Sequence, residues 1–282
     1  MQIYSTHLYS YYKMTQKKIP LDIEKVNHHI VNWLKTYAEN ARVKGFVVGV
    51  SGGIDSAVTS TLCAQTGLKT LCVELPIHQA ASQVSRKKEH IVHLKNRFPN
   101  VDSVSIDLTE TFETFKSSVP NSTDEAKYNL SLANSRARLR MTTLYYLAGV
   151  HDLLVAGTGN KVEDFGVGFY TKYGDGGVDL SPIADLMKSE VFALGRYLEV
   201  PISILNAAPT DGLFGDDRSD EDQLGASYDE LEKAMLAVEN GKAEADFKGR
   251  ELEVFNIYTR LHRVNQHKMN PIPTCIIPKE LR

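Results

Sequence analysis

Six consecutive residues, Ser51-Gly52-Gly53-Ile54-Asp55-Ser56, combine the groups that proteins use to bind phosphate. Gly52 and Gly53 have no Cβ, so their backbone N–H groups can come close to an anion. Ser51 and Ser56 add hydroxyl donors. Asp55 would repel a polyphosphate unless a cation lay between them, and a Mg²⁺ ion held by Asp55 and phosphate oxygens removes that conflict. The run therefore predicts a site for a polyphosphate with Mg²⁺.

The elements that flank this run suit an anion site. Residues 45–50 are apolar and rich in β-branched side chains, which is typical of a buried strand. Residues 56–66 are expected to form a helix that ends at Gly67. A helix that begins near Asp55 directs its free N–H groups and its dipole at the bound anion. The plain alternative is a Gly-Gly turn capped before a helix, and the matching strand and helix favour the phosphate loop.

The same alternation of strand and helix continues along the chain and predicts the fold class. The further predicted strands are 69–75, 101–108 and 152–156, and the predicted helices are 22–41, 81–98 and 129–150. Such alternation favours an α/β fold with a parallel sheet covered by helices on both faces. Ligands of these sheets bind beyond the carboxyl ends of the strands, so the loops after Val50, Leu75 and Ala156 are expected to line one site.

The second half of the chain differs from the first in its pattern of predicted elements. Residues 166–177 are rich in glycine and predict a long loop, which is either merely flexible or a closing lid. Helices are predicted over 189–199, 220–240 and 249–267. We interpret them as helical cover on the same domain, so that 19–282 is a single domain. Residues 1–18 are an N-terminal extension and a candidate for disorder.

Composition narrows the class of protein. The formal net charge of −3 disfavours a nucleic-acid binder. No apolar run approaches the ~18 residues of a membrane span. The three cysteines form no CxxC pair, which indicates a reducing, cytoplasmic setting without a zinc site. Cys63 and Cys72 are expected to be core residues. His90 and His93 are three residues apart, without an evident third metal ligand, and we interpret them as a polar helix face.

Two motifs together resemble a known family. The loop lacks the GxxxxGK[ST] and GxGxxG patterns and resembles the SGGxDS loop of the ATP pyrophosphatase superfamily. The run Gly157-Thr158-Gly159-Asn160-Lys161-Val162-Glu163-Asp164 and the later Thr171-Lys172-Tyr173-Gly174-Asp175-Gly176-Gly177 strongly resemble the ammonia-dependent NAD synthetases. Residues 134–138, 209–213 and 219–225 match as well. The resemblance covers roughly 20–275, and other SGGxDS enzymes lack the TKYGDGG run.

This resemblance implies a fold and a reaction. The fold would be a Rossmann-like sheet of the adenine nucleotide α-hydrolase type. The nicotinate carboxylate of deamido-NAD would attack the α-phosphate of ATP and release pyrophosphate. Ammonia would then attack the adenylated carbonyl, giving NAD and AMP. Positioning and charge stabilisation would supply most of the catalysis. The enzyme would be a C–N ligase, and the family's dinucleotide site at a dimer interface implies a homodimer.

The resemblance also implies roles for individual residues. ATP would be bound by Ser51, Gly52, Gly53, Ile54, Asp55, Ser56, Thr158, Lys188 and Thr210. Deamido-NAD would be bound by Asn134, Arg138, Lys172, Asp179, His267 and Lys268. Asp55 and Glu163 would bind Mg²⁺. Asp55, Asp175 and Lys188 would act in catalysis, with Asp175 near the nicotinate and the ammonia.

Two other readings stay open. The chain could be another SGGxDS adenylating enzyme, although the TKYGDGG run disfavours this. It could also be a nucleotide-binding module without catalysis, although both candidate metal carboxylates, Asp55 and Glu163, are present. Glutamine-dependent forms need an additional glutaminase domain with a nucleophilic cysteine, and no such domain is expected within these 282 residues. Free ammonia is therefore the expected nitrogen source.

Overall fold

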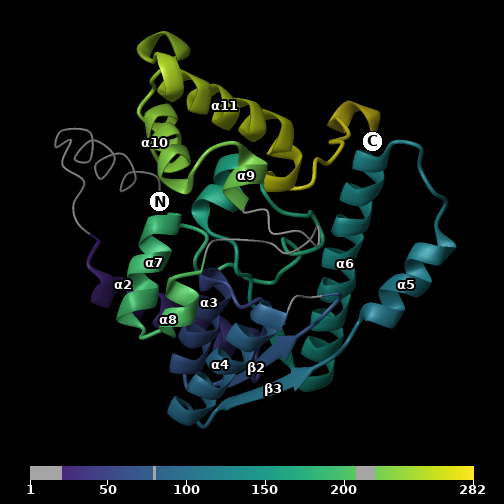
Figure 1. Ribbon diagram of the computed structural model, residues 1–282, viewed down its shortest axis with the longest axis vertical. Coiled ribbons are helices and arrows are strands. Elements are labelled where there is room, and N and C mark those ends of the chain that lie inside the picture. The colour runs from purple at the N-terminus through teal and green to yellow at the C-terminus, as the bar shows by residue number, and fades with distance from the viewer. Residues whose placement is uncertain (1–20, 79–80, 208–219) are drawn as a thin grey trace.

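The computed structural model describes residues 21–78, 81–207 and 220–282 and contains a four-stranded parallel sheet, in the lower half of the view in Figure 1. The strands are β1 (Gly45–Gly49), β2 (Lys69–Glu74), β3 (Val101–Ser105) and β4 (Leu153–Val155). Their order is β3-β2-β1-β4, with Gly45 opposite both Lys69 and Leu153. The predicted α/β class with a parallel sheet is confirmed.

Helices cover both faces of the sheet. One face carries α2 (Ile23–Ala41), α3 (Ile54–Gln65), α4 (Ala81–Arg97), α7 (Lys188–Tyr197) and α8 (Ile202–Leu205). The other face carries α5 (Thr109–Ser118) and α6 (Glu125–His151). Because successive side chains of a strand point to opposite faces, Phe46 and Val48 pack toward α3 while Val47 packs toward α6. All three are completely buried, so β1 is an inner strand of the core.

The C-terminal helices form a further layer beyond the carboxyl edge of the sheet. They are α9 (Asp220–Leu224), α10 (Tyr228–Glu239) and α11 (Gly249–Met269), with short turns η2 (Glu244–Asp246) and η3 (Lys279–Leu281) (Figure 1). Their apolar side chains pack with the π-helical turn η1 (Val162–Val167) and with Met187, which precedes α7. This layer therefore contacts the body of the molecule through Met187, and the single domain over 19–282 stays a prediction.

The structure corrects the predicted end of the third strand. β3 ends at Ser105 rather than at residue 108, and α5 begins at Thr109, where no helix was predicted. Asp107 Oδ1 accepts the backbone N–H of Thr109 at 2.8 Å, which turns the chain into the helix. This local side-chain contact carries no signal in the apolar periodicity.

The predicted helix over 220–240 is in fact two helices. Gly225 has a φ of +77°, a left-handed conformation that ends α9. Ser227 then caps α10, and Glu230 Oε2 accepts the backbone N–H of Ser227 at 2.9 Å, which completes a capping box. The predicted loop over 166–177 likewise begins inside a π-helical turn, η1.

Two expectations from composition can be compared with the structure. Cys63 and Cys72 are completely buried, as predicted, and Cys275 is exposed. Within the described residues no helix has both the length and the apolar character needed to cross a membrane.

His90 on α4 is completely buried, so its interpretation as part of a polar helix face was wrong. Its Nε2 lies 2.8 Å from Ser60 Oγ on α3. Its Nδ1 has no hydrogen-bond partner among the described residues. Burial, followed by the charges of His93 and Arg97, lowers the pKa of His90 to about 4. The folded protein therefore keeps this ring neutral.

We expect His90 to make the protein sensitive to acid. In the unfolded state this ring binds a proton below a pKa of about 6.5, whereas in the folded state it stays neutral down to about pH 4. As the pH is lowered through that window, the free energy of unfolding therefore decreases by up to about 1.4 kcal/mol per pH unit. His90→Gln removes this contribution, so the free energy of unfolding of the variant should decrease less steeply than that of the wild type as the pH is lowered. Urea unfolding across the window measures both slopes. His28→Gln, exposed on α2, is the control, and equal slopes for wild type and His90→Gln would contradict the assignment.

Candidate functional site

A pocket of about 270 Å³ opens where three parallel strands end. Val50 follows β1, Leu75 follows β2, and Ala156 follows β4, and all three line the pocket. Residues 51–53 and 157–159 line it as well, so the prediction that the loops after Val50 and Ala156 share one site is confirmed, whereas Leu75 is the sole residue that lines it among the described residues between β2 and α4. The other walls come from α3, α4, α6, α7 and the loop that contains Asp175.

The Ser51–Ser56 loop forms one wall of this pocket and is closed by its own hydroxyl groups. Ser56 Oγ accepts the backbone N–H of Ser51 at 3.1 Å and donates to Gly53 O at 3.1 Å. Ser51 Oγ accepts the N–H of Gly53 at 3.2 Å. Gly52 has a φ of +86°, which side chains rarely adopt, so a glycine is required there. Gly53 then caps α3, whose free N–H groups lie beside the pocket.

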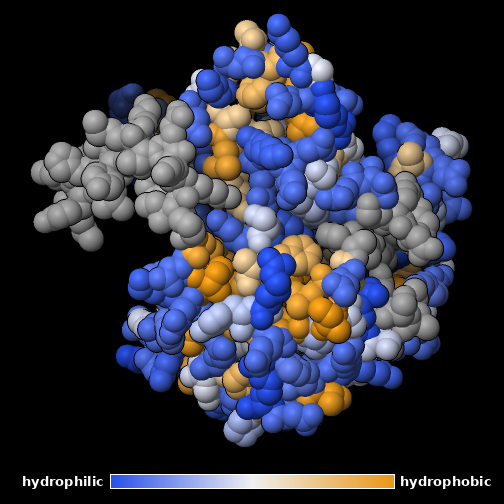
Figure 2. Space-filling model, turned by 60° about the vertical axis from the view of Figure 1, so that its left-hand side comes forward, coloured by the Kyte–Doolittle hydropathy of each residue, from blue (hydrophilic) through white to orange (hydrophobic). Residues whose placement is uncertain are grey.

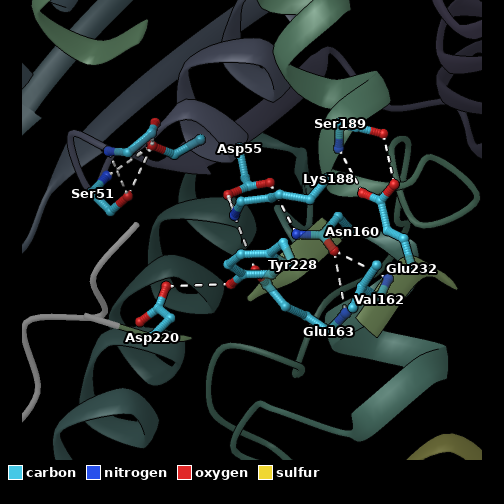
Figure 3. A network of polar contacts seen from close by, with 12 residues as sticks. Ser51, Asp55, Asn160, Val162, Glu163, Lys188, Ser189, Asp220, Tyr228 and Glu232 are labelled. Atoms are coloured by element: carbon cyan, nitrogen blue, oxygen red, sulfur yellow. Dashed lines mark hydrogen bonds and ion pairs between the residues drawn. The ribbon is translucent and has the colours of Figure 1, made fainter. Parts of the chain in front are cut away.

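Lys188, the first residue of α7, places its ammonium between two carboxylates (Figure 3). Nζ donates to Asp55 Oδ2 at 2.6 Å and to Glu163 Oε1 at 3.0 Å. The side chain is 4% exposed. Burial alone would lower the pKa of Lys188, but the two carboxylates outweigh burial and raise it. The ammonium therefore stays charged and joins α3, η1 and α7.

Two neutral side chains hold these carboxylates in place (Figure 3). Asn160 is completely buried. Its Nδ2 donates to Asp55 Oδ1 at 3.1 Å, and its Oδ1 accepts the backbone N–H of Glu163 at 3.2 Å. The hydroxyl of Tyr228 on α10 donates to Glu163 Oε1 at 2.5 Å. The Tyr228 ring lies 4.6 Å from Lys188 Nζ, a cation–π contact.

This end of the pocket carries an excess of negative charge. Asp55, Glu163, Asp164 and Asp175 all line it, against the single ammonium of Lys188. Burial, followed by the charges of Glu163 and Asp175, raises the pKa of Asp164 to about 8. Burial also raises the pKa of Asp55 and of Asp175. A further cation would relieve this repulsion.

The other end of the pocket is basic. Arg86 Nε donates to Gly52 O at 3.4 Å, which places its guanidinium against the Ser51–Ser56 loop. Arg140 Nε donates to Leu75 O at 3.0 Å. Burial, with the charge of Arg140, lowers the pKa of Lys87 to about 8. A metal-bound polyphosphate carries both signs of charge and matches a pocket with one acidic and one basic end.

The structure brings the residues predicted for ATP together around this pocket. All six loop residues line it, with Thr158 and Lys188, and Asp175, which was predicted for catalysis, lines it as well. Thr210 lies outside the described residues, so its predicted contact with ATP stays a prediction.

The residues predicted for deamido-NAD lie elsewhere. None of Asn134, Arg138, Lys172, Asp179, His267 and Lys268 lines the 270 Å³ pocket, and most of them surround the loop 168–179. From α6, Asn134 Oδ1 accepts the hydroxyl of Thr171 at 2.7 Å, and Arg138 Nη2 donates to Lys172 O at 3.3 Å. These contacts hold the loop against α6.

The end of α11 holds the same loop from another side. Lys268 Nζ donates to Gly168 O and to Tyr170 O, both at 2.7 Å. The ammonium of Lys172 donates to the carbonyl of His267. The glycine-rich loop is therefore held between α6 and α11 and is not merely flexible, while its action as a closing lid stays a prediction.

Asp179 connects this loop to the sheet. Its Oδ2 accepts the backbone N–H of Val155 at 2.8 Å, and its Oδ1 accepts the hydroxyl of Tyr145 at 3.0 Å. Both oxygens are thus used within the fold. The predicted role of Asp179 toward a dinucleotide remains a prediction.

Sequence reasoning missed several residues that shape the pocket. Asn160 and Asp164 lie within the 157–164 run, so their motif offered a signal that was not used for them. Tyr228 and Lys87 belong to no motif, and only the packing of α10 and α4 brings them to the pocket.

The donor set fits a magnesium ion. Two carboxylate oxygens, from Asp55 and Glu163, already converge on one cationic group, the ammonium of Lys188. No group of three or more His, Cys, Asp or Glu side chains suited to a metal occurs among the described residues. Magnesium commonly uses one or two protein carboxylates and completes its shell with phosphate oxygens and water. Asp55 and Glu163 are therefore the residues that would hold it.

A glycine-rich loop at the carboxyl edge of a parallel sheet, with its Asp55 joined to Glu163 through a buried lysine, is the arrangement of a nucleotide-dependent α/β enzyme. A family model described as NAD synthase matches residues 26–272. The chain belongs to the NAD synthase family, and its enzyme class is that of a ligase.

Known relatives agree with this assignment. An NH(3)-dependent NAD(+) synthetase of Mesoplasma florum is 35% identical over 266 residues, which are 93% of this chain and 99% of the relative. A solved structure of NMN synthetase from Francisella tularensis is 33% identical and has a TM-score of 0.76, covering 92% of this chain and 99% of the other. An NH3-dependent NAD synthetase from Campylobacter jejuni, 24% identical with a TM-score of 0.73 over 91% of this chain and 100% of that one, shares the fold.

We expect Lys188 to compete with a metal ion for the two carboxylates. Lys188→Met removes the ammonium, so the affinity for Mn²⁺ without nucleotide should rise by roughly tenfold or more. Without metal the variant should be less stable by about 3 kcal/mol, because two buried carboxylates lose their partner. Calorimetric titration with Mn²⁺ and thermal unfolding measure the two effects.

Lys161→Met is the matched control, because Lys161 pairs with Asp185 and Glu239 instead. Its Mn²⁺ affinity should match that of the wild type. An unchanged or weaker affinity in Lys188→Met would show that Asp55 and Glu163 do not form the metal site.

Proposed function

We propose that the protein amidates deamido-NAD with ammonia at the expense of ATP, giving NAD, AMP and pyrophosphate, the last step of NAD biosynthesis. The observation that carries this proposal is the ammonium of Lys188 between Glu163 and Asp55, which belongs to the Ser51–Ser56 loop, in a chain of the NAD synthase family. Relatives that match almost full length bear the name NH(3)-dependent NAD(+) synthetase, so ammonia is the proposed nitrogen donor.

The chemistry follows from activation of a carboxylate. A nicotinate oxygen forms a bond to the α-phosphorus, and the bond from that phosphorus to the bridging oxygen breaks, so pyrophosphate leaves. Ammonia then forms the C–N bond, the C–O bond to AMP breaks, and ammonia gives up a proton. Asp175 lines the pocket with a raised pKa, which suits a carboxylate that accepts this proton.

The chain's own groups would mainly position charge. The N–H groups and hydroxyls of the Ser51–Ser56 loop would bind the leaving pyrophosphate, with Arg86 and Lys87 beside it. Lys188 would turn from the carboxylates toward phosphate oxygens when a metal takes its place. Mg²⁺, when bound, would neutralise phosphate charge as the α-phosphate is attacked. Thr158 and Thr210 would add contacts to ATP.

The predicted deamido-NAD residues lie around the loop 168–179, beside α6. We propose that they bind the dinucleotide together with a second copy of the chain. Tyr146 and Val150 on α6 are one turn apart and remain 68% and 56% exposed, so they form an adjacent apolar pair on the surface of this helix. These features support a homodimer built on α6. The cysteine usage supports a cytoplasmic location.

A second candidate substrate is nicotinate mononucleotide. It shares the nicotinate carboxylate with deamido-NAD, and the Francisella tularensis structure, 33% identical to this chain, is named an NMN synthetase. The activation chemistry and the pocket residues would be the same. The two candidates differ in whether an adenylate half must be bound.

We expect purified protein with Mg-ATP, ammonium and deamido-NAD to form NAD and AMP in equal amounts. Glutamine in place of ammonium should support little turnover, and nicotinate mononucleotide should be the poorer acceptor. Asp55→Asn should reduce the rate by at least about a hundredfold, since it removes a metal ligand and a partner of Lys188. Quantifying both products by chromatography measures the outcome.

Ser122→Ala, on an exposed turn, is the control and should keep the wild-type rate. Faster amidation of the mononucleotide would replace the proposed substrate. AMP without either amidated product would indicate another SGGxDS enzyme, and no AMP would indicate a module that binds nucleotide without catalysis.

We expect the protein to sediment as a dimer, and Tyr146→Glu to shift it to monomer. The new charge would be buried without a partner in the interface, which costs several kcal/mol. Analytical ultracentrifugation measures the shift. Glu110→Lys on α5, which faces solvent, should leave the dimer intact, and an unshifted Tyr146→Glu would remove α6 from the interface.

A further inference from the structure

A groove of about 720 Å³, separate from the pocket, runs between α2, α10 and the segment 181–190. Its floor is apolar, because Ile30, Leu186 and Met187 are all at most 7% exposed. Its rim leaves Trp33 40% and Leu21 37% exposed. Figure 2 shows the side of the molecule on which α2 and α7 lie, where hydrophobic side chains gather in hollows between hydrophilic ones.

The rim of this groove is also acidic. Asp185, Glu190 and Glu239 line it, against one ammonium, that of Lys161. Lys161 Nζ lies 3.7 Å from Asp185 and 3.3 Å from Glu239. The side chain of Asp185 is nevertheless 99% exposed. The groove therefore presents an apolar floor with a net negative edge.

The first residues of the chain have the complementary character. Residues 1–20 include Lys13, Lys17 and Lys18 but no Asp or Glu, so they carry net positive charge. They also include four tyrosines, at positions 4, 9, 11 and 12. Aromatic side chains of this kind bury large areas against an apolar floor.

We propose that this groove is the docking site of the chain's own N-terminal segment, residues 1–20. Leu21 itself lines the groove, so the segment enters at the groove's edge. An extended chain advances about 3.3 Å per residue, so a few residues are enough to cross the floor. Tethering raises the local concentration of the segment to about the millimolar range, which suits a modest contact.

The size of the groove favours a single segment over a second copy of the protein. Clefts that enclose a small ligand measure about 300–1,000 Å³. A hollow of about 720 Å³ with one exposed tryptophan is in this range and fits a short stretch of chain.

Docking at this place would act on the neighbouring pocket. Lys161 follows Asn160, which binds Asp55, and Met187 precedes Lys188. The groove therefore lies directly behind the two segments that present these side chains. A docked segment would restrain both of them and so steady the contact between Lys188 and its carboxylates.

The test uses Trp33, which is the sole tryptophan of the chain, so its fluorescence reports on the groove. In the full-length protein, acrylamide should quench Trp33 weakly. Lys17→Glu with Lys18→Glu reverses the charge of the segment and should increase quenching and shift emission to the red. Asp185→Lys should do the same, and the triple variant should recover protection. Each ion pair between a lysine of the segment and a carboxylate of the groove contributes up to about 1 kcal/mol, or about fivefold in the docking equilibrium. Added salt should weaken these ion pairs and so reduce docking.

Asp102→Lys, exposed on β3 outside the groove, makes the same change of charge and is the control. It should quench like the wild type. Equal quenching of wild type and the Lys17→Glu/Lys18→Glu variant at low salt would overturn the proposal. So would an Asp102→Lys effect as large as that of Asp185→Lys, or a protection that depends on protein concentration, which would indicate a second copy.

Discussion

The ammonium of Lys188 is the contact on which the rest of the site depends. Asp55 comes from α3 and Glu163 from η1, and without a cation between them two poorly solvated carboxylates would repel each other. Layers that are remote in the chain meet at this point. Glu232 on α10 fixes the start of α7, next to Lys188. Its carboxylate accepts the backbone N–H of Ser189 at 2.8 Å and the hydroxyl of Ser189 at 2.7 Å (Figure 3).

The basic end of the pocket shows a second use of layering. Lys87 comes from α4 on one face of the sheet, and Arg140 comes from α6 on the other. They meet only where the strands between them end. A parallel sheet thereby brings charges from both of its faces to one edge, where a ligand can contact them together.

The sequence pattern predicted those features that depend on residues close together in the chain. The apolar run before Ser51 and the glycines after it gave the strand, the turn and the helix start, and Gly52 does adopt the positive φ that such a turn needs. Asp55, Glu163 and Lys188 were recognised by motif and meet as a group. Tyr228 and Lys87 could not be predicted, because only tertiary packing brings them in. The break at Gly225 was missed since the apolar period continues across it.

The strand order has a consequence for how this protein matures. β1 carries the phosphate loop, yet its neighbour on one side, β4, lies more than a hundred residues later, with Gly45 opposite Leu153. During synthesis on the ribosome, one edge of β1 remains unpaired until β4 has been synthesised. Contacts so distant in sequence slow folding and leave an edge open to wrong partners. The nucleotide loop is thus among the first functional segments to be synthesised and among the last to be completed.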